Sequence, residues 1–210
     1  MNMSQEFEQA TYWVNRHQDL KDDPRSVGNL AASKEQNEAG ERALVETMGA
    51  LAALVTTDMN RVLDLGCGYG RVTGAFLEHG LSYTGLDISP VALERARKTW
   101  PKAEFRETDL LNWTPSEQYD LVCVLYVLVH FVDDARWEQF FRSAAKSVSP
   151  GGYLLIADSF PDDKRKRATH YVSRPFSDYA ALIDDCGLRV DNEMWSRLFT
   201  DRPGDPVRAH

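Results

Sequence analysis

Three glycines at every second position are the residues whose type and spacing point most directly to ligand binding. Gly66, Gly68 and Gly70 follow the run Val62–Leu65, which is apolar except for Asp64 and has the residue types of a buried strand. Glycine accepts positive φ angles and has no Cβ, so a tight turn of this kind lets a ligand lie against main-chain atoms. A glycine-rich turn after an apolar strand also occurs without any ligand, and this alternative stays open for the run alone.

The spacing of the glycines distinguishes between two kinds of ligand. The dinucleotide fingerprint G-x-G-x-x-G requires its third glycine where Arg71 stands, and it places a pyrophosphate at a helix N-terminus. This chain instead has D-x-G-x-G-x-G over Asp64–Gly70. The spacing therefore argues against a pyrophosphate on this turn.

Asp87 is the second residue with a predicted chemical role. It directly follows the expected strand Ser82–Leu86. Ser89 and Pro90, which come next, suit the first turn of a helix. In a doubly wound sheet, an acid at this place lies beside the glycine turn, where its two oxygens can accept the protons of both ribose hydroxyls. A plain helix cap is the alternative. Together with the glycine turn, the position favours the ribose role and predicts a bound nucleoside.

Four segments, in the expected order along the chain, resemble motifs of the class I (Rossmann-like) S-adenosylmethionine-dependent methyltransferases of small-molecule type. They are Asp64–Gly70, Thr108–Leu111, the segment 126–134 after an apolar strand, and Pro150–Gly152. The resemblance extends over Arg61 to about Thr200.

The resemblance implies that S-adenosylmethionine is the cofactor and S-adenosylhomocysteine the product. The methionine part would lie on the glycine turn and pass Leu125, and the adenine would meet Asp109 and the amide of Leu110. Asp109 has an ordinary turn residue as its alternative role. The expected cofactor-binding residues are Asp64, Gly66, Cys67, Gly68, Gly70, Arg71, Asp87, Ile88, Asp109, Leu110, Leu125, Tyr12 and Trp13.

Candidate catalytic residues are His130, Tyr126 and His170. A histidine has a pKa near 6.5, which suits proton abstraction at neutral pH. Members of the resembled family with unlike chemistry share a histidine at the position of His130, so a structural or cofactor-side role is favoured there over a general base. Tyr126 is expected to face the substrate. His170 is a further base candidate.

A polar stretch rich in Lys and Arg surrounds His170. Lys164–Arg167 and Arg174 would receive a substrate carboxylate or phosphate if they are functional. A solvated charged surface is the simpler interpretation of Lys164–Arg167.

The N-terminal segment is polar but contains Tyr12 and Trp13. Members of the resembled family commonly close such a segment over the cofactor and substrate, which would bring Tyr12, Trp13, Arg16 and His17 to the site. The alternative is that the aromatic side chains only cover an edge of the core.

Composition limits the possible functions. The net charge of −8 and the pI of about 5.1 argue against general nucleic-acid binding, which requires Lys and Arg to neutralise phosphates. Cys67, Cys123 and Cys186 have no metal-ligand spacing, so we expect reduced thiols and no metal. No apolar run approaches the roughly 18 residues of a membrane span, and the polar start is not a signal peptide. We therefore expect a cytoplasmic monomer or homodimer that acts on a small-molecule substrate.

The elements that must position these residues form an α/β fold. We expect a doubly wound, mostly parallel, seven-stranded sheet with helices on both faces and an N-terminal helical lid. Residues 1–40 would form the lid, 41–200 the methyltransferase domain and 201–210 a tail. A helix is expected from Gly40 to about Thr56, strand five over Tyr153–Asp158, and the last two strands over Leu188–Met194 and Ser196–Thr200.

Three functional hypotheses follow. The first is a methyltransferase for a small molecule, with the O, N, S or C nucleophile undetermined and a place in secondary metabolism conceivable. The second is a non-catalytic S-adenosylmethionine-binding partner protein with the same fold, against which the intact acids and glycines argue. The third is an RNA methyltransferase, which the acidity disfavours.

Overall fold

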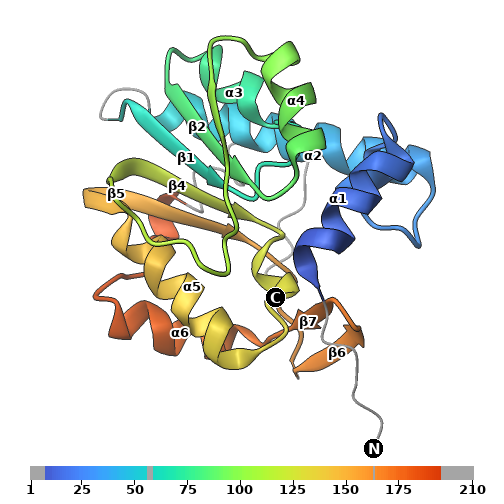
Figure 1. The fold of residues 1–210 in the computed structure, drawn as a ribbon. Coiled ribbons are helices and arrows are strands. Elements are labelled where there is room, and N and C mark those ends of the chain that lie inside the picture. The colour runs from blue at the N-terminus through green and yellow to red at the C-terminus, as the bar shows by residue number, and fades with distance from the viewer. Residues whose placement is uncertain (1–7, 56–58, 163, 195–210) are drawn as a thin grey trace, which may run out of the picture.

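The computed structural model describes residues 8–55, 59–162 and 164–194, and the structural statements below concern this part of the chain. Five strands form one parallel sheet in the order β3-β2-β1-β4-β5, with helices on both faces (Figure 1). The strands are β1 (Arg61–Leu65), β2 (Ser82–Asp87), β3 (Glu104–Glu107), β4 (Tyr119–Leu125) and β5 (Val148–Ala157). The helices are α1 (Gln9–Leu20), α2 (Lys34–Val55), α3 (Thr73–Leu77), α4 (Pro90–Thr99), α5 (Asp134–Lys146) and α6 (Phe176–Asp185), with short 3-10 turns η1 (Pro24–Ser26) and η2 (Leu128–His130).

Successive residues of each strand face two different cores. In β1, Val62 packs with α2, α3 and α4, whereas Leu63 and Leu65 pack with α5 and α6. In β4, Cys123 belongs to the first core and Val122 to the second. Strands that are buried on both faces need nearly continuous apolar residues, which these strands have. The predicted doubly wound α/β architecture is therefore confirmed.

The strand order places a crevice at the carboxyl ends of the central strands. The chain builds from β1 outward through β2 and β3, and then crosses back to place β4 on the other side of β1. The connections on the two sides diverge there, and open α/β sheets bind ligands at the carboxyl ends of the strands at such a point. Leu65, Asp87 and Leu125 end the three strands concerned.

The seven-stranded sheet is not found in the described residues. A separate antiparallel pair, β6 (Arg165–Ala168) and β7 (Tyr171–Ser173), occupies the polar stretch. The strand predicted over Leu188–Met194 is wrong: Leu188–Val190 is irregular, and a helical turn begins at Asn192. Asp191 accepts a hydrogen bond from the amide of Met194 at 2.9 Å, so it caps that turn. The predicted strand Ser196–Thr200 lies outside the described residues.

Two other predicted boundaries differ from the structure. Helix α2 begins at Lys34 and not at Gly40, because Ser33 and Gln36 form a capping box in which each side chain accepts the other residue's amide. Strand β5 begins at Val148 and not at Tyr153, since it continues through the Pro-Gly-Gly segment with an irregular register opposite β4. Gly151 has a φ of 81°, which fits this irregularity.

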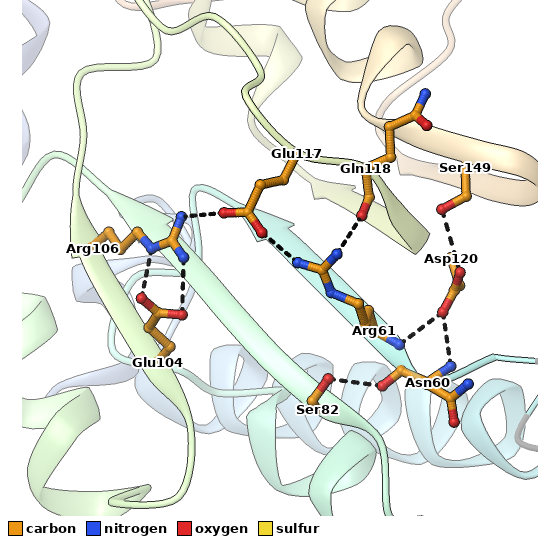
Figure 2. A network of polar contacts seen from close by, with 9 residues as sticks. All are labelled: Asn60, Arg61, Ser82, Glu104, Arg106, Glu117, Gln118, Asp120 and Ser149. Atoms are coloured by element: carbon orange, nitrogen blue, oxygen red, sulfur yellow. Dashed lines mark hydrogen bonds and ion pairs between the residues drawn. The ribbon is translucent and has the colours of Figure 1, made fainter.

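A polar network connects the strands at the end of the sheet opposite the crevice (Figure 2). Asp120 accepts hydrogen bonds from the amides of Asn60 and Arg61 at 2.9 and 3.0 Å. Glu117 accepts hydrogen bonds from the guanidinium groups of both Arg61 and Arg106. These bonds connect the segments that begin β1 and β4 with β3, so they fix the strand starts far from the crevice.

We predict that Asp120→Ala destabilises the fold. The substitution removes the acceptor of two main-chain N–H groups, which should lower the free energy of unfolding by about 1 to 2 kcal/mol. In a chain of this size, that loss lowers Tm by roughly 2 to 8 °C, measurable by thermal unfolding.

Glu94→Ala is the matched control. It removes an exposed carboxylate whose ion pair in the described part of the chain is with Lys98 one helical turn away, and such pairs contribute little. An equal decrease of Tm in both variants would contradict a specific role for Asp120.

Candidate functional site

A cavity lies at the carboxyl ends of β1, β2 and β4, with the N-terminal helix α1 as one wall. The residues that line it come from six segments of the chain, and from the glycine turn in particular. They are Gln9, Trp13, His17, Val27, Gly66, Cys67, Gly68, Arg71, Asp87, Ile88, Asp109, Leu110, Leu125, Tyr126, Val127, His130 and Phe131.

The glycine turn has the backbone geometry that its sequence predicts. Gly66, Gly68 and Gly70 have φ angles of 83°, 56° and 76°, which other residues rarely adopt. The amides of Gly66 and Cys67 both donate to the carbonyl of Leu86, at 2.8 and 3.0 Å. The turn is therefore tied to the end of β2 by main-chain bonds.

Side chains of the protein occupy the space that the missing Cβ atoms leave at Gly66 and Gly68, while both glycines still line the cavity. A Cβ on Gly66 would lie 2.4 Å from Val127, and a Cβ on Gly68 would lie 2.9 Å from Val27. Both valines also line the cavity. The glycines thus allow the two cavity walls to pack onto the turn.

Asp87 is buried at the centre of this arrangement. The residue is 8% exposed, and burial raises the pKa of its carboxyl group. One oxygen accepts the amide of Gly68 at 2.8 Å, and the other accepts the amide of Ser89 at 2.9 Å. The cap of α4 is the Ser89 side chain, which accepts from Ala92. The amide of Ile88 also interacts with this carboxylate, which still keeps acceptor capacity because a carboxylate offers about four acceptor sites.

Asp64 lies beneath the turn and does not line the cavity. The residue is 2% exposed, and burial raises the pKa of its carboxyl group to about 6. Tyr83 donates its hydroxyl hydrogen to one oxygen, while the other oxygen has no partner among the described residues. Gly70 is likewise absent from the cavity wall.

Asp109 lies in a turn at the cavity wall. Its oxygens accept from the amide of Leu111 at 2.9 Å and from the side chain of Asn112 at 2.8 Å, which makes it a turn residue. It also lines the cavity beside Leu110.

His130 has one ring nitrogen committed to a structural bond. Its Nδ1 lies 2.8 Å from the carbonyl oxygen of His170, and because a carbonyl only accepts, Nδ1 carries the hydrogen. In the neutral ring, Nε2 then has an unshared electron pair. Burial lowers the pKa of His130 to about 4, with a further contribution from the charge of Arg16, so the ring is neutral at pH 7.

Tyr126 lies at the cavity mouth in a strained conformation. It is 49% exposed and has a φ of 61°, which is uncommon for a residue with a side chain. The guanidinium carbon of Arg71 lies 6.0 Å from the centre of its ring. The amide of Tyr126 donates to the carbonyl oxygen of Ala157 at 2.7 Å, so β5 holds the backbone of Tyr126 in place.

Helix α1 reaches the site through Trp13. The indole packs edge-on against the ring of His130, with centroids 4.7 Å apart. Gln9, one turn earlier, donates to the carbonyl of His130. Tyr12 and His170 stack on each other and share a hydrogen bond of 3.1 Å between the hydroxyl and Nε2, outside the cavity wall.

Arg16 joins α1 to the segment that follows it. The residue is 8% exposed, and its guanidinium group donates to the carbonyls of Arg25 and Gly28 and to the hydroxyl of Tyr12. These bonds hold η1 and Val27 against the helix. Val27 in turn contacts the glycine turn at Gly68.

The structure brings most of the predicted site residues to one cavity. Ten of the thirteen expected cofactor residues line it, and Asp64, Gly70 and Tyr12 do not; of the three catalytic candidates, Tyr126 and His130 line it and His170 does not. Sequence reasoning did not place Gln9, Val27, Val127 or Phe131 there. A signal existed for α1, because Gln9, Trp13 and His17 recur every four residues on one helical face.

Two candidate cations of the polar stretch, Lys164 and Arg174, pair with Asp134. Arg174 is 1% exposed, donates to Asp134 at 2.7 Å and to the carbonyl of Phe131 at 2.9 Å, and stacks on Trp137. Arg174 therefore joins the start of α5 to the segment after β4, while its Nη1 has no hydrogen-bond partner among the described residues. In the described part of the chain, no three potential metal ligands gather, and no helix is both long and apolar enough to span a membrane.

Comparison with known proteins agrees with this architecture. Residues 62–152 match the family model described as a methyltransferase domain. A trans-aconitate 2-methyltransferase of Delftia acidovorans is 31% identical over 147 residues, which are 67% of this chain and 54% of that protein. A probable thiol methyltransferase 2 of Arabidopsis thaliana is 32% identical over 146 residues, which are 64% of this chain and 62% of that protein. The chain spans about half the length of most of the curated relatives it matches.

Solved structures share the fold. The complex of DhpI with SAM and HEP superposes with a TM-score of 0.61 and 22% identity, and covers 89% of this chain and 91% of that one. Streptomyces venezuelae DesVI has a TM-score of 0.60 and 18% identity, and covers 70% of this chain and 84% of that one. The chain therefore contains a methyltransferase domain over residues 62–152 and has the class I, Rossmann-like fold of S-adenosylmethionine-dependent methyltransferases.

Proposed function

We propose that this protein binds S-adenosylmethionine and transfers its methyl group to a small-molecule acceptor. The observation that carries the proposal is the cavity in which the glycine turn, the buried Asp87 carboxylate and the neutral ring of His130 meet. Relatives named as trans-aconitate and thiol methyltransferases support the same reaction class.

The residues present fit this cofactor. Asp87 retains acceptor capacity for ribose hydroxyls, and Asp109 with the amide of Leu110 offers an edge for adenine. Two carboxylates, Asp64 and Asp87, are buried at the glycine turn. These acids disfavour the two negative charges of a pyrophosphate, whereas the methionine part of a sulfonium nucleoside has an ammonium group that balances its carboxylate. The site therefore favours S-adenosylmethionine over a dinucleotide.

The protein's main contribution to the reaction would be orientation. When bound, the cofactor supplies a sulfonium-activated methyl carbon that an acceptor nucleophile attacks in line. Leu125 and Tyr126 at the end of β4, with Trp13 and Phe131 opposite, would hold the acceptor against that carbon and exclude water. The strained backbone of Tyr126 is braced by β5, which suits a fixed approach direction.

His130 is a cavity residue whose ring is unprotonated at pH 7 and can accept a proton from the acceptor, although its pKa of about 4 makes it a weaker base than an ordinary histidine. Its Nδ1–H is held by the His170 carbonyl, so Nε2 has the free electron pair that a general base requires. An acceptor hydroxyl or acidic carbon would use this base. An amine or thiolate would not need it.

Arg71 suggests the charge of the acceptor. It lines the cavity, faces the ring of Tyr126, and has no ion pair with an acid among the described residues. A guanidinium group at this place suits an acceptor with a carboxylate. The relatives named as trans-aconitate 2-methyltransferases agree with such an acceptor, although the chain spans only part of their length.

We also propose that α1 is a movable lid. Its side chains Gln9, Trp13 and His17 form one wall of the cavity, so displacement of the helix would open that wall to ligands.

Isothermal titration calorimetry tests the cofactor. We expect S-adenosylhomocysteine to bind and NAD not to bind. Asp87→Ala should weaken the binding of S-adenosylhomocysteine by about 1 to 3 kcal/mol, which is about a 5- to 150-fold increase in Kd, because charged hydrogen bonds to the ribose are lost. Preference of the wild-type protein for NAD would refute the proposal.

Asp87→Asn and Glu107→Ala complete this test. Asp87→Asn keeps the side-chain size and should also weaken binding, which separates the lost charge from a collapsed turn. Glu107 ends the neighbouring strand β3 and is exposed, so Glu107→Ala should leave Kd unchanged. Thermal unfolding of each variant verifies that it is folded.

A proton-abstraction role predicts the kinetics of His130→Ala. Incubation of the wild-type protein with metabolite extract and methyl-labelled cofactor, followed by mass spectrometry, identifies the acceptor. With that acceptor as substrate, the kcat/KM of His130→Ala should be about 100-fold or more below that of the wild-type protein. A base must be unprotonated, and the pKa of His130 is about 4, so wild-type activity should persist as pH falls from 8 to 5.5 and decline only near pH 4.

Two outcomes would contradict this role. A wild-type pH profile that falls around pH 6.5 would indicate a different titrating group. A weaker affinity of His130→Ala for S-adenosylhomocysteine with unchanged kcat would indicate a cofactor-side role. His79→Ala, which alters an exposed histidine after α3, serves as the control and should change neither quantity. Tight cofactor binding without methyl transfer to any metabolite would instead favour a non-catalytic partner protein.

A further inference from the structure

His17 is a buried polar side chain in the cavity wall without a hydrogen-bond partner. The residue is 4% exposed, and within the described residues neither Nδ1 nor Nε2 forms a hydrogen bond. Buried polar groups in folded proteins are nearly always paired, because an unpaired one has lost its water without compensation. A histidine that lines a cavity in this condition is suited to bind a ligand.

The course of α1 places His17 at the nucleoside end of the cavity. Gln9 and Trp13 contact His130, which follows β4. From there the helix runs toward α4, which begins just after Asp87 at the end of β2 (Figure 1). His17 lies two turns beyond Gln9 on the same face and lines the cavity together with Asp87.

The charge of the ring determines which group it can bind. Burial and the charges of Arg16 and Arg95 lower the pKa of His17 to about 4, so the imidazole is neutral at pH 7. A neutral imidazole has one N–H donor and one acceptor, which complement a hydroxyl group. Asp87 supplies acceptors only, so it can take the hydroxyl protons but cannot donate to the hydroxyl oxygens.

We propose that His17 binds a ribose hydroxyl of the nucleoside from the side opposite Asp87, an inference that rests on the function proposed above. The ring donates its N–H to the hydroxyl oxygen while Asp87 accepts the hydroxyl proton. Because Gln9 and Trp13 are on the same helix, this bond also holds them against His130. Binding of the nucleoside thereby stabilises the acceptor half of the cavity.

Calorimetry with S-adenosylhomocysteine tests the proposal. We expect His17→Phe to raise Kd about tenfold, the effect of losing one well-formed hydrogen bond. His17→Gln, which offers both a donor and an acceptor, should restore most of the affinity. The matched control His79→Phe should bind as the wild-type protein does.

The Tm of the ligand-free variants separates binding from folding. His17→Phe removes no hydrogen bond from the free protein, so its Tm should equal or exceed that of the wild-type protein. A variant that binds ten times more weakly without being less stable identifies a ligand contact. A Tm loss that accounts for the weaker binding in both His17 variants would overturn the proposal.

Ligands that lack one hydroxyl identify the bonded group. The probes are 5′-methylthioadenosine and its 2′-deoxy and 3′-deoxy forms. We expect the difference between wild-type and His17→Phe affinity to disappear for one deoxy form. An equal difference between wild-type and His17→Phe affinity for all three probes would overturn the ribose assignment. A His17→Phe variant with an unchanged Kd for S-adenosylhomocysteine but a higher KM for the acceptor would overturn it as well. Failure of the wild-type protein to bind S-adenosylhomocysteine would refute the proposed function itself, a distinguishable result.

Discussion

The bond between the amide of Gly68 and the carboxylate of Asp87 is the contact on which the site depends. The carboxylate is removed from water, which raises its pKa, and it is held by main-chain N–H groups of Gly68 and Ser89. These bonds join the turn after β1 to the start of α4 after β2. One buried anion therefore fixes two neighbouring strand ends relative to each other. The floor of the cavity is set by backbone geometry, and the residues around it supply its walls.

Local patterns in the sequence were sufficient for the parts of the fold that local physics determines. The two-sided burial of β1 and β4 follows from their apolar runs, and the turn follows from glycines that accept positive φ. The start of α2 was missed although Ser33 and Gln36 carry a capping-box signal. The strand expected over Leu188–Met194 does not form, because the capping side chain of Asp191 favours a helical turn.

The candidate site was predictable where strand ends determine it and not where distant segments meet. Asp87, Asp109 and Leu125 follow strands of one sheet, so their convergence follows from topology. Val27 reaches the turn only because Arg16 holds η1 against α1, which no spacing in the sequence reveals. His170 contributes a carbonyl to His130 and stacks its ring on Tyr12. A pattern of side-chain types cannot indicate a role that belongs to a main-chain oxygen.

The bonds of Arg16 have a consequence for turnover. They join α1, η1 and Val27 into one unit, and that unit touches the cavity at both ends, at His130 through Trp13 and at Gly68 through Val27. A rotation that lifts Trp13 away from the acceptor end therefore also lifts Val27 from the glycine turn. If the protein works as proposed, with α1 as a movable lid, departure of the methylated product and exchange of the spent nucleoside would share a single energy barrier, and altering this one arginine would change the speed of both.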